Sequence, residues 1–350
     1  MSPRAEQRDR RATLRDVARL ADVHVTTASR ALDSQRASSV SAGTAERVKR
    51  AAKVLDYRPH ELARNLRRGR TGTVGVVVPD LTNSHFAFVV RGVADGLEAN
   101  GLVTVVTESG DDRARFNRLL DHLGDGRVDG IVMAAAREGD GARLERYARA
   151  VVPVVLAVRT FRGTRLPSVY TEDRLGGALA ARHLLELGHR RIAQVPGPER
   201  ISPFRARSRG FVDTMRQAGL AVHGTALGAV APTREEGERL TGELLSRSKR
   251  ARPTAVFAAN DSMAVGALAA INRRGLRCPD DISVVGYNDN AFAALMSPPL
   301  TTVRAANYEV GFRSAEILQA VLQGEVVPRV STFDPVLVVR SSTAAPASER

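Results

Sequence analysis

Seven short apolar runs alternate with helical segments after residue 72, and this pattern leaves few folds open to that part of the chain. The runs are Val74–Val78, Val103–Val106, Gly130–Met133, Val154–Val158, Ile192–Val195, Ala255–Ala258 and Ile282–Val285. Continuous apolar runs of this length are typical of strands buried on both faces of a parallel sheet. The segments with helical spacing are Phe86–Ala99, Arg115–Leu123, Leu144–Ala150, Leu175–Leu187, Arg207–Ala218, Glu235–Leu245 and Ser262–Arg274. The alternation predicts parallel sheets with helices on both faces.

There are more strand–helix units than one sheet comfortably holds. We therefore expect an α/β core of two lobes with two parallel doubly wound sheets, and we take the loop Arg162–Pro167 as the break between the lobes. Ligands of such sheets bind at the carboxyl ends of the strands, so a ligand would lie in the cleft between the lobes.

The first 70 residues differ from the rest in charge. They contain 17 Lys and Arg against 8 Asp and Glu, and thus hold +9 of the formal net charge of +14. This excess favours a module that binds a polyanion, and a solvated basic arm is the alternative.

Residues 14–66 are expected to form four short helices and no strand. Apolar residues at helical spacing mark the first helix, beginning at Leu14, and the second, His24–Leu32. Ser41 is the expected N-cap of the third helix, which runs to about Leu55, and His60–Leu66 is the fourth.

The two helices within Thr13–Arg30 are joined by a tight turn, as in a helix-turn-helix. The second helix would project His24, Val25, Thr26, Ser29 and Arg30. An arginine can bond bidentately to guanine, and valine and threonine can contact thymine methyl groups. A helical hairpin in an ordinary small core is the alternative.

Enzymatic motifs are missing from the sequence. It has no GxGxxG after a strand, no Walker GxxxxGK and no GxSxG. Its histidines never pair at metal-ligand spacing, and the lone Cys278 cannot form an internal disulfide. We expect no catalytic activity, no cofactor and no metal, and we expect Asp111, Asp112, Asp280 and Asp281 to be solvated loop charges.

The sequence also lacks a signal peptide and any apolar run long enough to span a bilayer. We therefore expect a cytoplasmic protein without a membrane partner.

Eight motifs follow one another along the chain: TLRDVARLADVHVTTASRAL, RVKRAAKVLDYRP, LARNLRRGRTGTVGVVVPDL, ARHLLELGHRRIA, RPTAVFAANDSMAVGALAAINRRGL, DISVVGYNDN, PPLTTV and VLVVRSST. Together they resemble the LacI/GalR family of transcriptional regulators. The resemblance covers residues 12–343 and keeps the order and spacing of the motifs.

The resemblance implies an all-α headpiece followed by a two-lobed core like that of periplasmic binding proteins. The expected divisions are a basic arm (1–11), the helix-turn-helix domain (12–58), a hinge helix and linker (59–72), the core (73–343) and a tail (344–350). Within the core, we expect an N-terminal lobe of about 73–168 plus 301–328 and a C-terminal lobe of about 169–300 plus 329–343.

By the same resemblance, Val25, Thr26 and Arg30 occupy positions that read the major groove. Thr13, Ser29 and Thr44 lie near phosphates, with His24 as a further contact. Leu66 would insert into the minor groove as a wedge that kinks the duplex, with Ala63 beside it. The alternative for Leu66 is packing against the headpiece.

Two headpiece positions depart from the family pattern. Asp22 stands where the turn usually has glycine, and aspartate tolerates left-handed backbone better than most residues. His24 replaces the common serine at the start of the second helix, where we expect a slightly weaker cap and a pH-dependent phosphate contact.

The ligand-facing places of the family correspond here to His85, Phe86, Arg207, Asn260 and Asn288. An arginine suits an anionic group or a hydroxyl cluster, and a phenyl ring suits stacking. Val158 and Asn288 replace acidic residues that usually bind sugar hydroxyls, which leaves open an anionic ligand, a more apolar ligand or no ligand at all. Packing in the cleft wall is the alternative role for each of these residues.

The function expected is a sequence-specific transcriptional regulator, a repressor that binds a pseudo-palindromic operator in double-stranded DNA as a homodimer. Its effector would be a sugar, sugar phosphate or other metabolite in the cleft between the lobes. The alternative is a solute-binding protein of the periplasmic type without DNA-linked regulation, and the basic headpiece argues against it.

Overall fold

The structure is a computed structural model that describes residues 12–32, 39–57, 71–222 and 228–347. The chain divides into two compact units, Met1–Thr71 and Gly72–Arg350, and each is described by itself. The predicted basic arm and nearly all of the predicted hinge and linker, with Ala63 and Leu66, lie outside the described residues.

The first unit has three described helices around a small apolar core: α1 (Leu14–Leu20), α2 (Val25–Ala31) and α3 (Ala42–Val54). Val17, Ala28 and Val48 contribute one core residue from each helix. Thr13 begins α1 with a capping box, in which its hydroxyl and backbone N–H both contact the Asp16 carboxylate. Asp22 in the turn has φ 52°, so the expected left-handed conformation at this position is confirmed.

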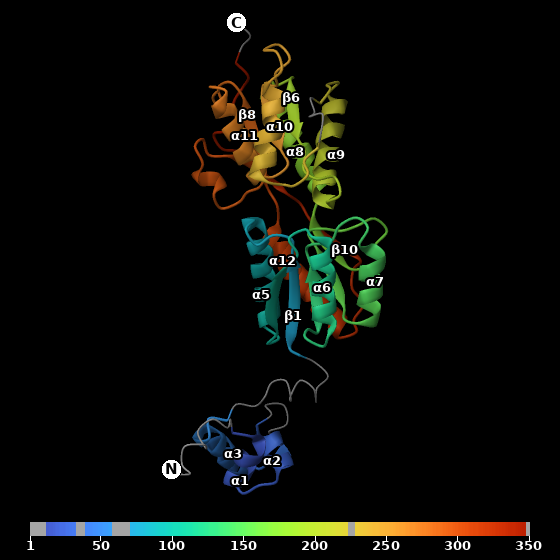
Figure 1. Ribbon diagram of the computed structural model, residues 1–350, viewed down its shortest axis with the longest axis vertical. Helices are drawn as coiled ribbons and strands as arrows, with labels where there is room; N and C mark the ends of the chain where they lie inside the picture. Colours follow the sequence, from blue (N-terminus) through green and yellow to red (C-terminus); the bar gives the residue numbers. More distant parts are fainter. Residues whose placement is uncertain (1–11, 33–38, 58–70, 223–227, 348–350) are drawn as a thin grey trace, which may run out of the picture. The chain divides into compact units, whose positions relative to one another are not determined.

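The N-terminal lobe of the core holds a six-stranded parallel sheet in the order β10-β5-β4-β3-β1-β2 (Figure 1). The strands are β1 (Thr73–Val78), β2 (Val103–Glu108), β3 (Gly130–Met133), β4 (Val154–Ala157), β5 (Ser168–Thr171) and β10 (Val330–Phe333). Helices α5 (Ser84–Glu98) and α12 (Asn307–Leu322) pack on one face. Helices α6 (Arg113–Gly124) and α7 (Gly141–Ala150) pack on the other.

The C-terminal lobe holds a five-stranded sheet in the order β11-β9-β8-β7-β6. Its strands are β6 (Ile192–Val195), β7 (Ala255–Ala258), β8 (Ser283–Asn288), β9 (Thr301–Arg304) and β11 (Val336–Val338). Helices α8 (Asp173–Glu186) and α9 (Ser202–Gln217) cover one face, and α10 (Arg234–Leu245) and α11 (Asp261–Arg273) cover the other. A short 3-10 helix, η2 (Ala293–Leu295), follows β8. The sheet is parallel except for the edge strand β11, which pairs antiparallel with β9.

All seven apolar runs form strands, and the predicted fold class is confirmed. The loop Arg162–Pro167 does not separate the lobes, because it joins β4 to β5 within one sheet. The chain instead crosses between the lobes after β5, after β9 and after β10.

Two predicted lobe assignments are therefore wrong. Strand β9 belongs to the C-terminal sheet and β10 to the N-terminal sheet. The prediction placed β9 in the same lobe as the following α12, as in an ordinary βα unit, whereas here β9 lies in one lobe and α12 in the other. It also separated β10 from α12, although both belong to the N-terminal lobe. The threonines and serine of β9 and β10 carry no apolar pattern that would assign either strand to a sheet.

Among the helices of the described residues, none is both long and apolar enough to cross a membrane.

Candidate DNA-binding helix and candidate effector cavity

The second helix of the headpiece, α2, presents a polar face. His24, Thr26 and Arg30 are exposed, and Val25 and Ser29 are half-buried. Thr26 and Arg30 are one helical turn apart, so their side chains lie on the same face. Val25 packs against the headpiece core, which leaves only part of its side chain for contact with a base.

His24 is the N-cap of α2. Its Nδ1 accepts a hydrogen bond from the Thr26 N–H at 3.4 Å and lies 2.8 Å from the Thr26 hydroxyl. The imidazole therefore takes over the capping role of the more common serine, although at a long distance. Because Nδ1 faces the helix, Nε2 is the ring nitrogen left to meet a phosphate.

The two threonines expected near phosphates lie at the starts of helices: Thr13 is the N-cap of α1, and Thr44 lies in the first turn of α3. Thr13 is exposed, but its hydroxyl donates to Asp16 at 2.6 Å. Thr44 is half-buried in the first turn of α3, where its hydroxyl accepts from Ser41 at 2.9 Å. Ser41 is the N-cap residue of α3, as predicted, but its side chain makes no capping hydrogen bond to the helix backbone.

The five predicted effector residues, together with Val158, line one cavity in the core, at the carboxyl ends of strands from both sheets. The cavity measures about 30 Å³. That volume holds one or two waters, so a metabolite would require the lobes or the lining side chains to move apart. The complete lining is Asn83, His85, Phe86, Val158, Arg159, Ile201, Pro203, Phe204, Arg207, Pro232, Asn260 and Asn288.

Arg207, on α9, is the most strongly held polar residue of this lining. Its Nε donates to Asp173 at 2.8 Å, its Nη1 to the Ala259 carbonyl at 2.8 Å and its Nη2 to Asn288 at 3.4 Å. The guanidinium also lies over the Tyr287 ring, 3.6 Å from the centroid. These contacts fix the plane of the guanidinium before any ligand arrives, and two of its five N–H groups have no hydrogen bond among those described.

His85, in the first turn of α5, is buried in the opposite wall with its Nδ1 unpartnered among the described residues. Burial, and after it the positive charges of Arg207 and Arg159, together lower the pKa of His85 to about 3, although a hydrogen bond with Asn307 acts in the opposite direction. The imidazole is therefore neutral at physiological pH. It can offer Nδ1 to a ligand without adding a charge to the cavity.

The two asparagines of the lining are held in different ways. Asn260 is the N-cap of α11, where its Oδ1 accepts from the Met263 N–H at 2.7 Å, and its amide donates to the Pro232 carbonyl at 3.0 Å. Asn288 ends β8 with φ 112° and turns its Oδ1 toward Arg207. Both polar atoms of the Asn260 side chain thus bond within the protein, whereas the Asn288 amide nitrogen has no hydrogen bond within the described part of the chain.

Arg159 and Asp111 were missed as site residues. Arg159 lines the cavity and forms a fork-like pair with Asp111, with N–O distances of 2.6 and 3.1 Å. The expectation that Asp111 is a solvated loop charge is therefore wrong. No sequence pattern links two residues on separate loops, and the only indication was that each follows a strand at its carboxyl end.

Val158, the departure noted in the sequence, follows β4 with φ 63°. This left-handed conformation is unfavourable for a β-branched residue, and such strain often occurs at binding sites. The valine adds an apolar surface to the lining where the family usually has an acid.

Comparisons with known proteins match both units of the chain. The lacI family of bacterial regulatory proteins matches residues 13–60, and the periplasmic binding protein-like domain matches residues 181–343. The HTH-type transcriptional repressor CytR of Escherichia coli (strain K12) is 31% identical over 343 residues, which cover 98% of this chain and 99% of the relative. The ribose operon repressor of the same organism is 33% identical, covering 95% and 99%.

A solved structure agrees over nearly the whole chain. The Lac repressor dimer bound to operator and the anti-inducer ONPF has a TM-score of 0.85 and 29% identity, and the match covers 96% of this chain and 100% of that one. The headpiece, the two-lobed core and the full-length relatives therefore lead to one conclusion: this chain belongs to the LacI family of bacterial regulatory proteins.

Proposed function

We propose that the protein represses transcription by binding a pseudo-palindromic operator as a homodimer, under the control of a small molecule in the cavity between its lobes. One observation carries this proposal. A single chain joins a helix-turn-helix to a two-lobed core with a polar cavity, and repressors match it over both parts. A solute-binding protein would have no use for the headpiece. Because the relatives are repressors that act on DNA, we place the protein in the cytoplasm and assign it no catalytic role.

In the headpiece, Arg30 and Thr26 are the residues assigned to bases, with a smaller contribution from Val25. His24, Ser29, Thr13 and Thr44 are assigned to phosphates. Both assignments rest on the resemblance, and the exposure of Thr13, His24, Thr26 and Arg30 supports it for these four residues. Ala63 and Leu66 keep their proposed minor-groove role from the sequence alone.

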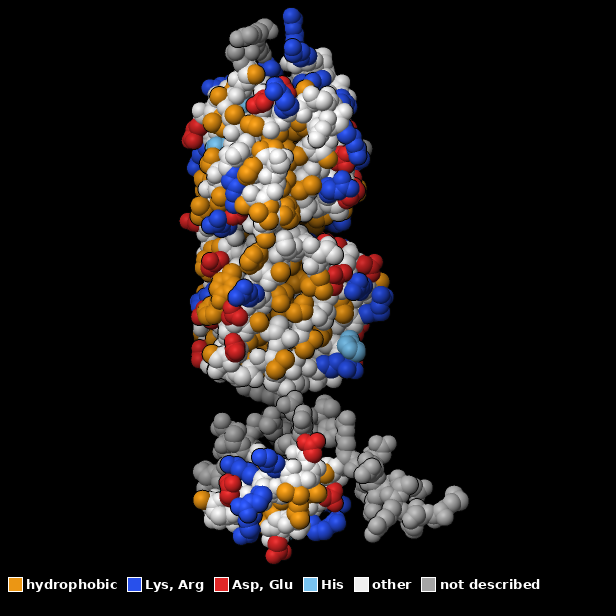
Figure 2. Space-filling view, turned by 90° about the vertical axis from the view of Figure 1, so that its left-hand side faces the viewer, with side chains coloured by type: hydrophobic (Ala, Val, Ile, Leu, Met, Phe, Trp, Pro, Cys, Tyr) orange, Lys and Arg blue, Asp and Glu red, His pale blue; other side chains and the backbone are white. Residues whose placement is uncertain are grey.

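The homodimer is supported by exposed apolar surface on the core. Figure 2 shows hydrophobic side chains gathered on one face across both lobes, on the side where α5 lies in Figure 1. Phe88 on α5, Val103 and Val105 on the edge strand β2, and Leu295 in η2 are all exposed large hydrophobic residues. A second copy of the chain would cover such residues and would pair two headpieces with the two halves of a twofold operator.

The effector assignment rests on the five cavity residues His85, Phe86, Arg207, Asn260 and Asn288. Solved relatives hold cellobiose in the regulator CelR and ribose in a LacI family regulator from Enterococcus faecium. Because Arg159 and Arg207 are each paired with an aspartate inside the protein, the cavity has little unbalanced charge. A sugar or a related uncharged metabolite suits that balance better than a sugar phosphate does.

Selection of DNA from a random pool by the full-length protein tests the operator assignment. We expect twofold-symmetric sites whose affinity falls steeply with salt, because phosphate contacts release counterions. Arg30→Ala should lose about 1–3 kcal/mol of discrimination at one base pair in each half-site. The matched control is Arg216→Ala, an exposed arginine of the core, which should leave the selected sequence unchanged. Absence of enriched sites, or an affinity independent of salt, would contradict the proposal.

Thermal unfolding with ribose, cellobiose, ribose 5-phosphate and nucleosides tests the effector assignment. A ligand specific for the folded state raises the melting temperature, and a ligand that does so should also change the affinity for the selected operator. Asn288→Ala should reduce both effects. A stabilising ligand whose effect survives in Asn288→Ala would place the effector site elsewhere.

A further inference from the structure

The cavity wall and one of the three connections between the lobes meet at the turn that follows β8. Two consecutive residues of this turn, Asn288 and Asp289, have left-handed φ angles of 112° and 56°. Residues other than glycine rarely adopt this conformation unless the surrounding structure holds them there. Contacts with surrounding residues must therefore stabilise the backbone conformation in which Asn288 lines the cavity.

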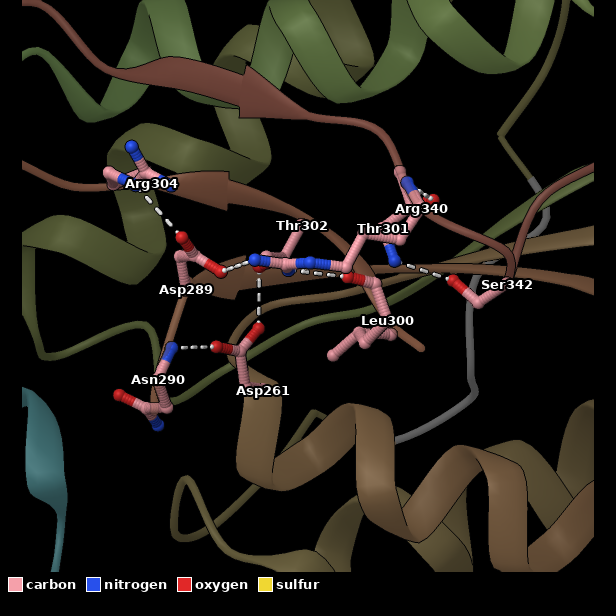
Figure 3. A network of polar contacts seen from close by, with 9 residues as sticks. All are labelled: Asp261, Asp289, Asn290, Leu300, Thr301, Thr302, Arg304, Arg340 and Ser342. Carbon is pink, nitrogen blue, oxygen red and sulfur yellow. Dashed lines mark hydrogen bonds and ion pairs between the residues drawn. The ribbon is translucent and has the colours of Figure 1, made fainter. Parts of the chain in front are cut away.

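Asp289 holds the turn from one side (Figure 3). Its Oδ2 accepts from the Arg304 Nε at 2.8 Å and its Oδ1 from the Arg340 Nη2 at 2.6 Å. Arg340 also donates to the carbonyl oxygen of Leu300 at 2.8 Å. Both carboxylate oxygens are thus bonded, and the Asp289 side chain is only 9% exposed.

Asp261 holds the same turn from the other side. Its Oδ2 accepts from the Asn290 N–H at 2.7 Å, and its Oδ1 from the Thr302 hydroxyl at 2.6 Å. The preceding residue, Asn260, lines the cavity. Figure 3 shows both carboxylates beside the turn, with Arg304 of β9 bonded to Asp289 and Thr302 of β9 bonded to Asp261.

Arg304 is also the last residue of β9, from which the chain crosses to the other lobe. Only Ala305 and Ala306 separate it from α12. The Ala306 N–H donates to the Thr171 hydroxyl at 3.3 Å, at the end of the N-terminal-lobe strand β5. Two residues thus connect Arg304 to the first turn of α12.

Helix α12 is packed closely against α5. A Cβ atom on Gly92 would collide with the backbone of Tyr308, and one on Gly311 would collide with the backbone of Val89. The first turn of α5 carries His85 and Phe86, on the far wall of the same cavity. The contacts run without a gap from Asn288 through Asp289, Arg304 and α12 to α5.

We propose that Asp289 is a positioning residue of the effector response, which ties the cavity wall in the C-terminal lobe to the β9–α12 crossover and thereby to the N-terminal lobe. A ligand that moves Asn288 acts on the adjacent Asp289, and through the Asp289 carboxylate on Arg304, which donates to it. This inference rests on the proposed function for the effector, but the physical connection can be measured without effector or DNA. A contiguous set of bonded groups is a route for coupling only when a change at one end alters the other.

Hydrogen exchange of the full-length protein tests the connection. In Asp289→Asn and in Arg304→Gln, we expect peptides that cover residues 305–311 to exchange at least threefold faster than in the wild type, along with residues 286–290. Peptides from β6 and α10 should not change. The control is Asp213→Asn, which breaks an exposed ion pair with Arg174 in the same lobe and should leave residues 305–311 unaltered.

Two results would overturn the proposal: faster exchange confined to residues 284–304, or the same acceleration in every peptide. The first result would show that Asp289 stabilises only its own part of the C-terminal lobe, and the second that the substitution lowers the stability of the whole protein.

Operator affinity gives a second measurement on the same variants. We expect each single substitution to change the operator Kd at least threefold, and the double variant to change it no further, because both remove one connection. Single variants within twofold of the wild type would contradict the proposal. If the wild type binds no selected DNA, the proposed function fails, and hydrogen exchange still decides the role of Asp289.

Discussion

Arg207 and Asp173 form a buried ion pair in which the arginine Nε lies 2.8 Å from the carboxylate Oδ1, with the two side chains only 4% and 7% exposed. The pair joins the first turn of α8 to α9, and it holds the guanidinium at the edge of the cavity. Removal of one partner of such a pair leaves the other charge buried without compensation, and this costs more than the pair itself contributes.

Asp173→Asn should therefore lower the free energy of unfolding by about 3–5 kcal/mol. Urea denaturation at fixed protein concentration measures this change. The matched control is Asp213→Asn on the same two helices, where the pair with Arg174 also has an N–O distance of 2.8 Å but is 68% and 35% exposed. That variant should lose no more than about 1 kcal/mol. Equal losses in the two variants would show that burial does not set the strength of the Arg207–Asp173 pair.

The contact between α5 and α12 depends on glycine. Gly92→Ala should destabilise the core by about 1–3 kcal/mol or more, because the new methyl group collides with the Tyr308 carbonyl, and a backbone atom cannot move aside. Gly242→Ala on α10 is the control, since no atom lies within 4 Å of the added Cβ. There alanine should stabilise by up to about 1 kcal/mol through its higher helix propensity. Denaturant unfolding of both variants decides the sign, and a stabilised Gly92→Ala would refute the close packing of the two helices.

Six of the seven apolar runs identified strands that are buried on both faces, where burial leaves a continuous apolar pattern in the sequence, and the seventh, Val103–Val106, forms the partly exposed edge strand β2. The six buried strands are β1, β3, β4, β6, β7 and β8. Strand β10 is a partly exposed edge strand, and β9 carries threonines that bond to polar partners. Their lobe depends on contacts with residues far away along the chain, which local periodicity does not encode.

The candidate cavity also has features that the sequence predicts and features that it does not. Its five expected residues follow from the family motifs, and the structure brings them together. The pairs Arg159–Asp111 and Arg207–Asp173 could not be predicted, because 48 and 34 residues separate the partners. These two ion pairs set the net charge of the cavity, and they form only when the fold brings the partners together.

The neutral imidazole of His85 makes the core sensitive to acid. Its pKa is lowered from 6.5 to about 3 by burial and by Arg207 and Arg159, so the neutral form stabilises the fold above pH 6.5. That stability is lost as the pH falls from 6.5 toward 3, because over this range His85 binds a proton in the unfolded chain but stays neutral in the folded chain. His85→Gln, which keeps a polar side chain but cannot be protonated, should remove this dependence. Between pH 7 and pH 4, the wild type should lose on the order of 3 kcal/mol more unfolding free energy than the variant.

Denaturant unfolding of wild type and His85→Gln at pH 7, 5.5 and 4 measures that difference. Burial raises the pKa of Asp261 to about 7, so its effect on stability runs in the opposite direction over this range. Because Asp261 is present in both proteins, its contribution cancels when the two are compared at each pH. His122→Gln on α6 is the control for a histidine outside the cavity, and it should follow the wild type. If His85→Gln and the wild type lose stability in parallel, His85 is not held neutral by its surroundings, and the cavity gains a positive charge in the pH range where an effector would bind.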